Sequence, residues 1–148
     1  MKAKDFLRQY QKLNSIIENK LIEREQWKAV AYNITPGGNK SPDKVQAAGN
    51  PQKMADAVNR YVDLEKEIDG YIDRLIDRKA EILSVIEQLD TPEYNILHMH
   101  YIQDVALFEI SSKIGRSYSW VKAKHNRGLD NVEKILEKSE KFLKKVLL

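Results

Sequence analysis

An apolar row with a seven-residue repeat constrains this chain more than any other feature. A repeat of seven places its members on one face of an α-helix and is typical of coiled coils. Asn50 is a suitable N-cap residue and Pro51 suits the first helical position, so we expect one long helix over residues 51–89. Glu65 and Lys79 are its polar exceptions, and the apolar members are Met54, Val58, Tyr61, Ile68, Ile72, Leu75, Ile82, Ile86 and Leu89.

A second amphipathic segment precedes this row and predicts a helix over residues 4–32. Its apolar residues recur at spacings of four and three, which is the period of one helical face; they are Phe6, Tyr10, Leu13, Ile17 and Leu21. Prolines and glycines between residues 33 and 50 break the helical pattern and predict a loop there. Two long helices joined by one loop predict an antiparallel hairpin or a dimeric bundle.

The segment Asp90-Thr91-Pro92-Glu93 predicts a helix end followed by a new helix start. Thr91 can act as the N-cap, with Pro92 in the first helical position. We therefore predict an all-α protein with two domains, a coiled-coil-like hairpin over 1–90 and a second domain over 91–148. The second domain should contain helices over 94–102 and 106–114, and a third helix from Tyr118 that can continue to the C-terminus.

The turn between the last two helices is typical of a helix-turn-helix motif. Gly115 suits the left-handed conformation that ends many helices, and Ser117 suits the N-cap of the next one. In such a motif the second helix enters the major groove of duplex DNA with its first turns. Its N-terminal half should therefore carry side chains that can touch bases or phosphates.

Charge distribution supports the same interpretation. Residues 1–90 contain fifteen basic and fifteen acidic side chains, whereas residues 91–148 contain ten basic and seven acidic. Between residues 113 and 127 there are five cations and no acid. A local positive surface favours a polyanionic partner. We predict double-stranded DNA as that partner, contacted by Lys113, Arg116, Ser117, Tyr118, Ser119, Trp120, Lys122, Lys124, His125 and Arg127.

Two members of this set have alternative roles. Trp120 can stack near DNA or cover the neighbouring helix, and His125 lies on the inner edge of the third helix, where it can be packed or face a phosphate.

The C-terminal third resembles the fourth region of bacterial sigma factors. The matching residues are Leu97, Tyr101, Glu109-Ile110, Ile114-Gly115, Ser117, Val121 and Leu129. His100, Ala106, Ser111, Lys124 and Gly128 depart from that pattern. The whole chain also resembles phage and prophage sigma-factor-like regulators of Gram-positive bacteria, of the ArpU and RinA type. This second resemblance covers the first helix, the loop from Ser41-Pro42 to Asn50-Pro51, the segment Lys53–Ala57, the long second helix and the sigma-like end. It implies a phage-encoded regulator of transcription acting on late genes.

Several other classes of function lack sequence support. The chain has no cysteine, and His98 and His100 are two residues apart, so they point to different sides of a helix. No nucleophile–base pair, glycine-rich phosphate loop or carboxylate dyad is visible, so we expect no enzyme, cofactor or metal site. There is no apolar run of membrane-spanning length and no signal peptide, so we expect a protein of the bacterial host cytoplasm.

Three questions stay open at this level. A sigma-like adaptor that binds RNA polymerase and a small-terminase-like packaging subunit are alternatives to a DNA-binding regulator. The apolar row between residues 54 and 89 is longer than the first helix can cover. We therefore expect a homodimer formed through the long helices, with an intramolecular hairpin as the alternative.

The predicted loop gives a first testable expectation. Segments rich in Pro and Gly with few apolar anchors bury little surface. Backbone amides between Asn33 and Asn50 should therefore exchange rapidly with solvent in the free protein. Hydrogen–deuterium exchange with mass spectrometry measures this, and strong protection throughout the segment would contradict it.

Overall fold

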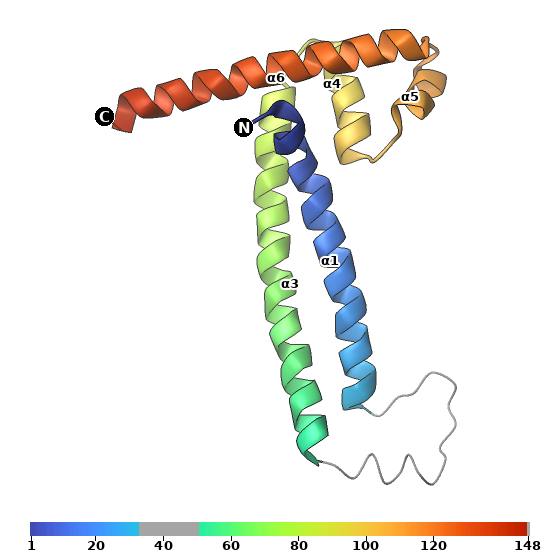
Figure 1. The fold of residues 1–148 in the computed structure, drawn as a ribbon, viewed down its shortest axis with the longest axis vertical. Helices are drawn as coiled ribbons and strands as arrows, with labels where there is room; N and C mark the ends of the chain where they lie inside the picture. The colour runs from blue at the N-terminus through green and yellow to red at the C-terminus, as the bar shows by residue number, and fades with distance from the viewer. Residues whose placement is uncertain (33–50, 148) are drawn as a thin grey trace. The chain divides into compact units, whose positions relative to one another are not determined.

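The computed structural model describes residues 1–32 and 51–147, and the predicted loop over 33–50 lies outside them. Every regular element in these residues is helical, which confirms the all-α prediction for them (Figure 1). The elements are α1 (Ala3–Ala31), α3 (Pro51–Ile86), α4 (Thr91–Leu97), the π-helical turn η1 (His98–Ile102), α5 (Leu107–Ile114) and α6 (Tyr118–Leu147). No helix among them is long and apolar enough to cross a membrane.

The chain forms two compact units, and the two long helices contribute to both. The first unit combines Met1–Leu13 with Leu75–Leu148, and the second is Asn14–Arg74. The boundary predicted at residue 90 lies inside the first unit. Within each unit α1 and α3 lie side by side and run in opposite directions (Figure 1). A hairpin of α1 and α3 therefore agrees with the sequence analysis.

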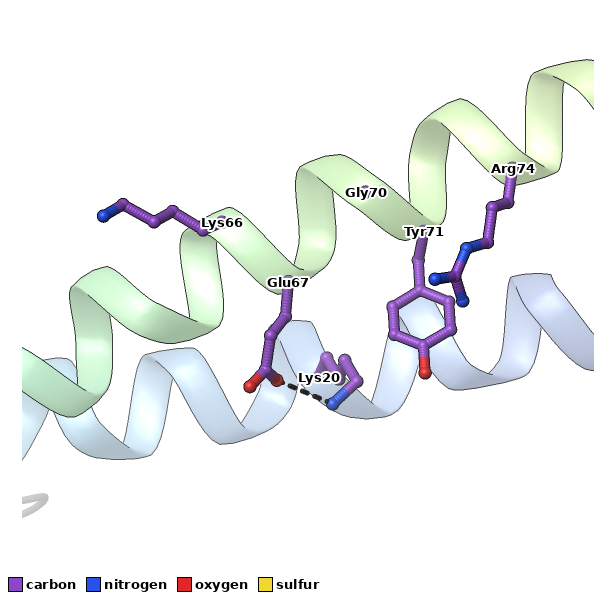
Figure 2. Close-up of a pocket in the computed structure, with 6 residues that line it drawn as sticks. All are labelled: Lys20, Lys66, Glu67, Gly70, Tyr71 and Arg74. Atoms are coloured by element: carbon purple, nitrogen blue, oxygen red, sulfur yellow. Dashed lines mark hydrogen bonds and ion pairs between the residues drawn. The ribbon is translucent and has the colours of Figure 1, made fainter.

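The second unit is held by buried apolar side chains and by ion pairs at its edge. Ile17, Leu64 and Ile68 are buried between α1 and α3. Lys20 Nζ lies 2.9 Å from Glu67 Oε2, and this hydrogen bond raises the pKa of Lys20 and lowers that of Glu67 (Figure 2). The pair lines a cleft of about 480 Å³ with Lys66, Gly70, Tyr71 and Arg74.

The apolar row of α3 is less buried than its seven-residue repeat predicts. Met54 is 38% exposed and Val58 is 44% exposed, whereas Ala57 and Leu64, which lie outside the row, are completely buried. The apolar surface of α3 is wider than one partner helix, and α1 covers only one flank of it. In the first part of α3, burial therefore depends on contact with α1 and not on membership of the repeat, whereas Ile68, Ile82 and Ile86 of the row are buried.

Two apolar clusters organise the first unit. One joins the start of α1 to the end of α3, α4, η1 and α6; its buried members are Ala3, Phe6, Leu7, Ile82, Ile86, Leu97, Tyr101 and Val132. The other comprises Ile96, Val105, Ile110 and Val121, with Met99, Leu107 and Trp120 packed against it. The first cluster therefore anchors α6 to the hairpin end of the same unit.

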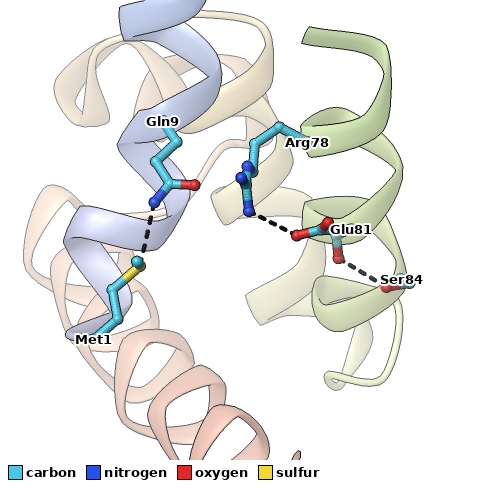
Figure 3. A network of polar contacts seen from close by, with 5 residues as sticks. All are labelled: Met1, Gln9, Arg78, Glu81 and Ser84. Carbon is cyan, nitrogen blue, oxygen red and sulfur yellow. Dashed lines mark hydrogen bonds and ion pairs between the residues drawn. The ribbon is translucent and has the colours of Figure 1, made fainter. Parts of the chain in front are cut away.

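Figure 3 shows polar contacts on the surface of this unit between residues that are close in the sequence. The Gln9 side-chain amide lies 3.2 Å from Met1 Sδ. Arg78 pairs with Glu81 at 2.8 Å, and the Ser84 hydroxyl donates to the Glu81 carbonyl oxygen. The unit also has polar contacts between distant segments, since Gln11 Nε2 of α1 donates to the His100 carbonyl oxygen of η1 at 2.9 Å. Apolar clusters and polar contacts together therefore hold its tertiary arrangement.

Several predicted helix boundaries differ from those observed. α3 ends at Ile86 rather than residue 89, because Gln88 and Leu89 donate to carbonyl oxygens three residues back and form a tighter turn. Asp90, not Thr91, occupies the N-cap of α4, and its side chain makes no capping hydrogen bond.

The helix predicted over 94–102 also divides in two. It is α-helical only to Leu97 and then becomes the π-helical turn η1. The Gln103 N–H donates to the His98 carbonyl oxygen five residues back, and Asp104 then ends the element at φ 59°. α5 begins at Leu107, one residue later than predicted, and α6 continues to Leu147.

Two glycines should respond oppositely to substitution by alanine. Gly115 has φ 67°, a left-handed conformation, so Gly115→Ala should destabilise by about 1–2 kcal/mol. Gly70 lies inside α3 with no atom within 4 Å of an added Cβ, so Gly70→Ala should stabilise by about 0.5–1 kcal/mol. Thermal unfolding followed by circular dichroism measures both, and a shift of the same sign for the two variants would contradict this account.

Candidate nucleic-acid interface

The turn between α5 and α6 has the predicted helix-turn-helix geometry. Gly115 ends α5 in the left-handed conformation, and the Arg116 N–H donates to the Ser111 carbonyl oxygen at 3.1 Å. The Ser117 Oγ accepts a hydrogen bond from the Trp120 N–H at 3.1 Å, which caps α6. The connection is therefore only three residues long, and both of its ends are satisfied by hydrogen bonds.

A buried apolar cluster fixes α5 and α6 relative to each other. Ile110 of α5 and Val121 of α6 are completely buried, and Ile96 of α4 packs with them. Trp120 is half-buried against the same cluster, so it covers the core of the motif. Of the two roles considered for Trp120, this packing fits the covering role.

The structure brings most of the predicted DNA-contacting residues onto one exposed region. Trp120 and Lys124 are half-buried. Seven members are exposed around the end of α5, the turn and the first three turns of α6: Lys113, Arg116, Ser117, Tyr118, Ser119, Lys122 and Arg127. We call these seven residues the cationic surface.

Aromatic rings support the cations around this region. The Arg116 guanidinium lies 5.0 Å from the centroid of the Trp120 ring, and Lys124 Nζ lies 5.7 Å from the same centroid. Lys122 Nζ lies 4.5 Å from the centroid of the Tyr118 ring. A cation held over an aromatic face keeps its charge and loses part of its conformational freedom. These cations are therefore partly ordered before any anion binds.

Beside the cationic surface lies an exposed aromatic residue that the sequence analysis missed. Phe108 of α5 is 68% exposed, and its ring meets the Tyr118 ring edge-on with centroids 5.6 Å apart. In the sequence Phe108 lies between apolar core positions of the same helix, and nothing there distinguishes it from them. Only the orientation of α5 shows that it faces solvent beside the cationic surface.

A buried carboxylate ties α6 to the start of α4. Glu93 is 2% exposed and receives Arg127 Nε at 3.3 Å and Asn131 Nδ2 at 2.9 Å. A Cβ at Gly128 would lie 3.1 Å from Leu97 Cδ1, so glycine allows this close approach of the two helices. The sequence analysis placed Glu93 only at the start of a helix. Within the described residues, Arg127 is the one member of the cationic surface shown paired with a carboxylate.

His125 does not belong to the exposed region, and we remove it from the predicted DNA contacts. It is 5% exposed, and its Nε2 accepts a hydrogen bond from the Tyr101 hydroxyl at 2.8 Å. Burial lowers the pKa of His125, and the positive or ionisable groups of His100, Lys4 and Arg8 lower it further. Burial also raises the pKa of Tyr101. His125 is thus a neutral, packed core residue at neutral pH.

Comparison with known proteins gives a family without a known activity. The sequence pattern of a family described as "Protein of unknown function (DUF1492)" matches residues 35–133. No curated protein matches the chain, and no solved structure does. The whole of the α3 helix and of the cationic surface lies within the matched range.

The buried His125 makes stability depend on pH. An unfolded chain protonates this residue below its ordinary pKa of 6.5, whereas the folded protein protonates it only at lower pH. Stability should therefore fall as pH decreases from 6.5, by up to about 1.4 kcal/mol per pH unit from this group. In His125→Gln, which keeps an acceptor for Tyr101, urea unfolding between pH 5 and 7 should depend less on pH. An unchanged pH dependence in this variant would contradict the assignment.

Proposed function

The chain belongs to the DUF1492 family, whose function is unknown, and we propose that it binds double-stranded DNA through α5 and α6. One observation carries this proposal. Exposed cations surround the helix-turn-helix turn that Ser117 caps, and the segment 113–127 that supplies them contains no acidic residue. Such a surface gives salt-dependent affinity for any duplex, because each neutralised phosphate releases counterions.

The residues of this surface have distinct proposed tasks. Tyr118, Ser119 and Lys122 lie on the first two turns of α6, where a recognition helix touches base edges in the major groove. Lys113 lies near the end of α5 and Arg116 lies in the turn, and we assign both to phosphates, which set register without reading sequence. Arg127 contributes less, because Glu93 already neutralises it.

We propose that this binding regulates transcription in the bacterial cytoplasm, without enzymatic activity. The support is the resemblance of the C-terminal third to the fourth region of sigma factors, which extends through Glu109-Ile110, Gly115, Ser117 and Val121. The resemblance to phage regulators of the ArpU and RinA type further suggests phage late genes as targets. A homodimer is the proposed binding form, because dimeric helix-turn-helix proteins engage two half-sites about 34 Å apart.

A triple substitution tests DNA binding. Lys113, Arg116 and Lys122 are exposed and have no structural ion pair to lose among the described contacts, so their replacement by Ala should leave the fold intact. Loss of the two phosphate contacts of Lys113 and Arg116 should reduce the slope of log affinity against log salt by about 1.8, and loss of the Lys122 charge should add up to about 0.9. Fluorescence anisotropy with labelled duplex DNA at several salt concentrations measures this slope.

The matched control replaces Lys12, Lys28 and Lys66 by Ala, which removes the same charge from exposed positions elsewhere. Its salt slope should stay close to that of the unmodified protein. Equal slopes for the two triple variants would refute the proposed surface. A chain that binds RNA polymerase but no duplex would instead be a sigma-like adaptor, and a large ring in solution would indicate a packaging subunit.

A further inference from the structure

The last turns of α6 form an amphipathic helix whose apolar face is uncovered. Phe142, Leu143, Val146 and Leu147 are 67%, 55%, 64% and 81% exposed. At about 100° per residue these four side chains occupy an arc of roughly 140°. Lysines occupy the opposite arc, and residues 138–147 contain four lysines and one glutamate, a net charge of +3. We call residues 138–147 the α6 tail.

A second uncovered apolar face lies along α3 and carries the opposite charge. Met54, Val58, Val62 and Ile72 are 38%, 44%, 40% and 37% exposed. Residues 54–74 contain six acidic and three basic side chains, a net charge of −3. Glu65 lies on the same face and is 45% exposed. We call this face the α3 stripe; Arg24 of α1 lies 3.9 Å from Glu65 at its edge.

We propose that the α6 tail of one copy packs on the α3 stripe of a second copy, and that the α6 tail of the second copy packs on the α3 stripe of the first. Charge selects this pairing, because two tails would bring together net charges of +3, and two stripes net charges of −3. Like charges placed opposite each other disfavour association, and opposite charges favour it. In the proposed dimer the exchange is reciprocal, which gives two equal contacts related by a two-fold axis.

An antiparallel orientation satisfies both apolar and charged residues. Phe142 and Val146 are four residues apart, as are Val58 and Val62, so their ridges can interdigitate. With Val146 opposite Val58, Phe142 meets Val62 and Lys138 lies beside Glu65. In the parallel orientation Lys138 would lie before the first turn of α3, away from the acidic residues. The antiparallel arrangement is therefore the one we propose.

This inference specifies how the proposed homodimer forms, and it does not depend on DNA binding. The α6 tail follows the part of α6 that carries the cationic surface, in the same continuous helix. A dimer built through the tail would thus hold two DNA-reading helices in one assembly. If this dimer interface proves wrong, the proposed DNA contacts of each single copy would be unaffected.

Disulfide trapping tests the pairing directly, because the chain contains no cysteine. Val58→Cys and Val146→Cys are made separately in the full chain, mixed under reducing conditions and then oxidised. The mixture should give a covalent dimer on a non-reducing gel, and each variant alone should give far less. Dominant crosslinking of Val146→Cys alone would mean tail-to-tail pairing, and of Val58→Cys alone stripe-to-stripe pairing. Either result, or no crosslink at all, would overturn the proposal.

A charge exchange tests the register in solution. Glu65→Lys and Lys138→Glu should each weaken dimerisation by about tenfold, and the double variant should restore it. Sedimentation equilibrium measures the dissociation constant, and circular dichroism confirms that each variant is folded. Ile22→Ser, which changes a 58% exposed residue of α1 outside the stripe, is the control and should dimerise normally. Monomeric unmodified protein, or no restoration in the double variant, would refute this interface.

Discussion

Burial of the Glu93 carboxylate is the constraint on which the placement of α6 depends. A buried carboxylate must keep its hydrogen-bond partners, because leaving it unpaired costs about 3–5 kcal/mol. Both of its partners, Arg127 and Asn131, belong to α6, and Gly128 between them lets that helix approach Leu97 closely. The contact therefore acts together with the buried Val121 and Val132 in setting the rotation of α6 about its own axis. The exposed side chains of its first turns take their direction from that rotation.

The same contact changes how the charge of the chain should be counted. Five cations lie between residues 113 and 127, but Arg127 is neutralised by Glu93 and Lys124 is half-buried beside Trp120. The charge that remains fully available is concentrated around the turn and the first turns of α6. A recognition helix needs its charge there, since those turns are the ones that enter a groove.

Some apolar residues on the helices stay exposed within a single chain, and we propose that association between chains buries them. α1 covers one flank of α3, and the second flank carries Met54, Val58 and Val62 in the open. The α6 tail exposes a similar face with opposite charge. Extended apolar faces of this kind on a protein surface mark sites of interaction. The apolar residues of α3 thus serve two purposes: one flank packs on α1 within the chain, and the other is available for association between chains.

Periodicity and helix-terminal residues determined much of this protein from the sequence: two long helices, the left-handed Gly115, the Ser117 cap and the exposed cations around them. These features are local, since a helix period, a positive φ and a cap each depend on a few neighbouring residues. The tertiary structure decided the rest. It buried Ala57 and Leu64 rather than Met54 and Val58, turned His125 inward to Tyr101, exposed Phe108 and paired Glu93 with Arg127. Each of these outcomes depends on which helix covers which flank, and segments distant in the sequence determine that.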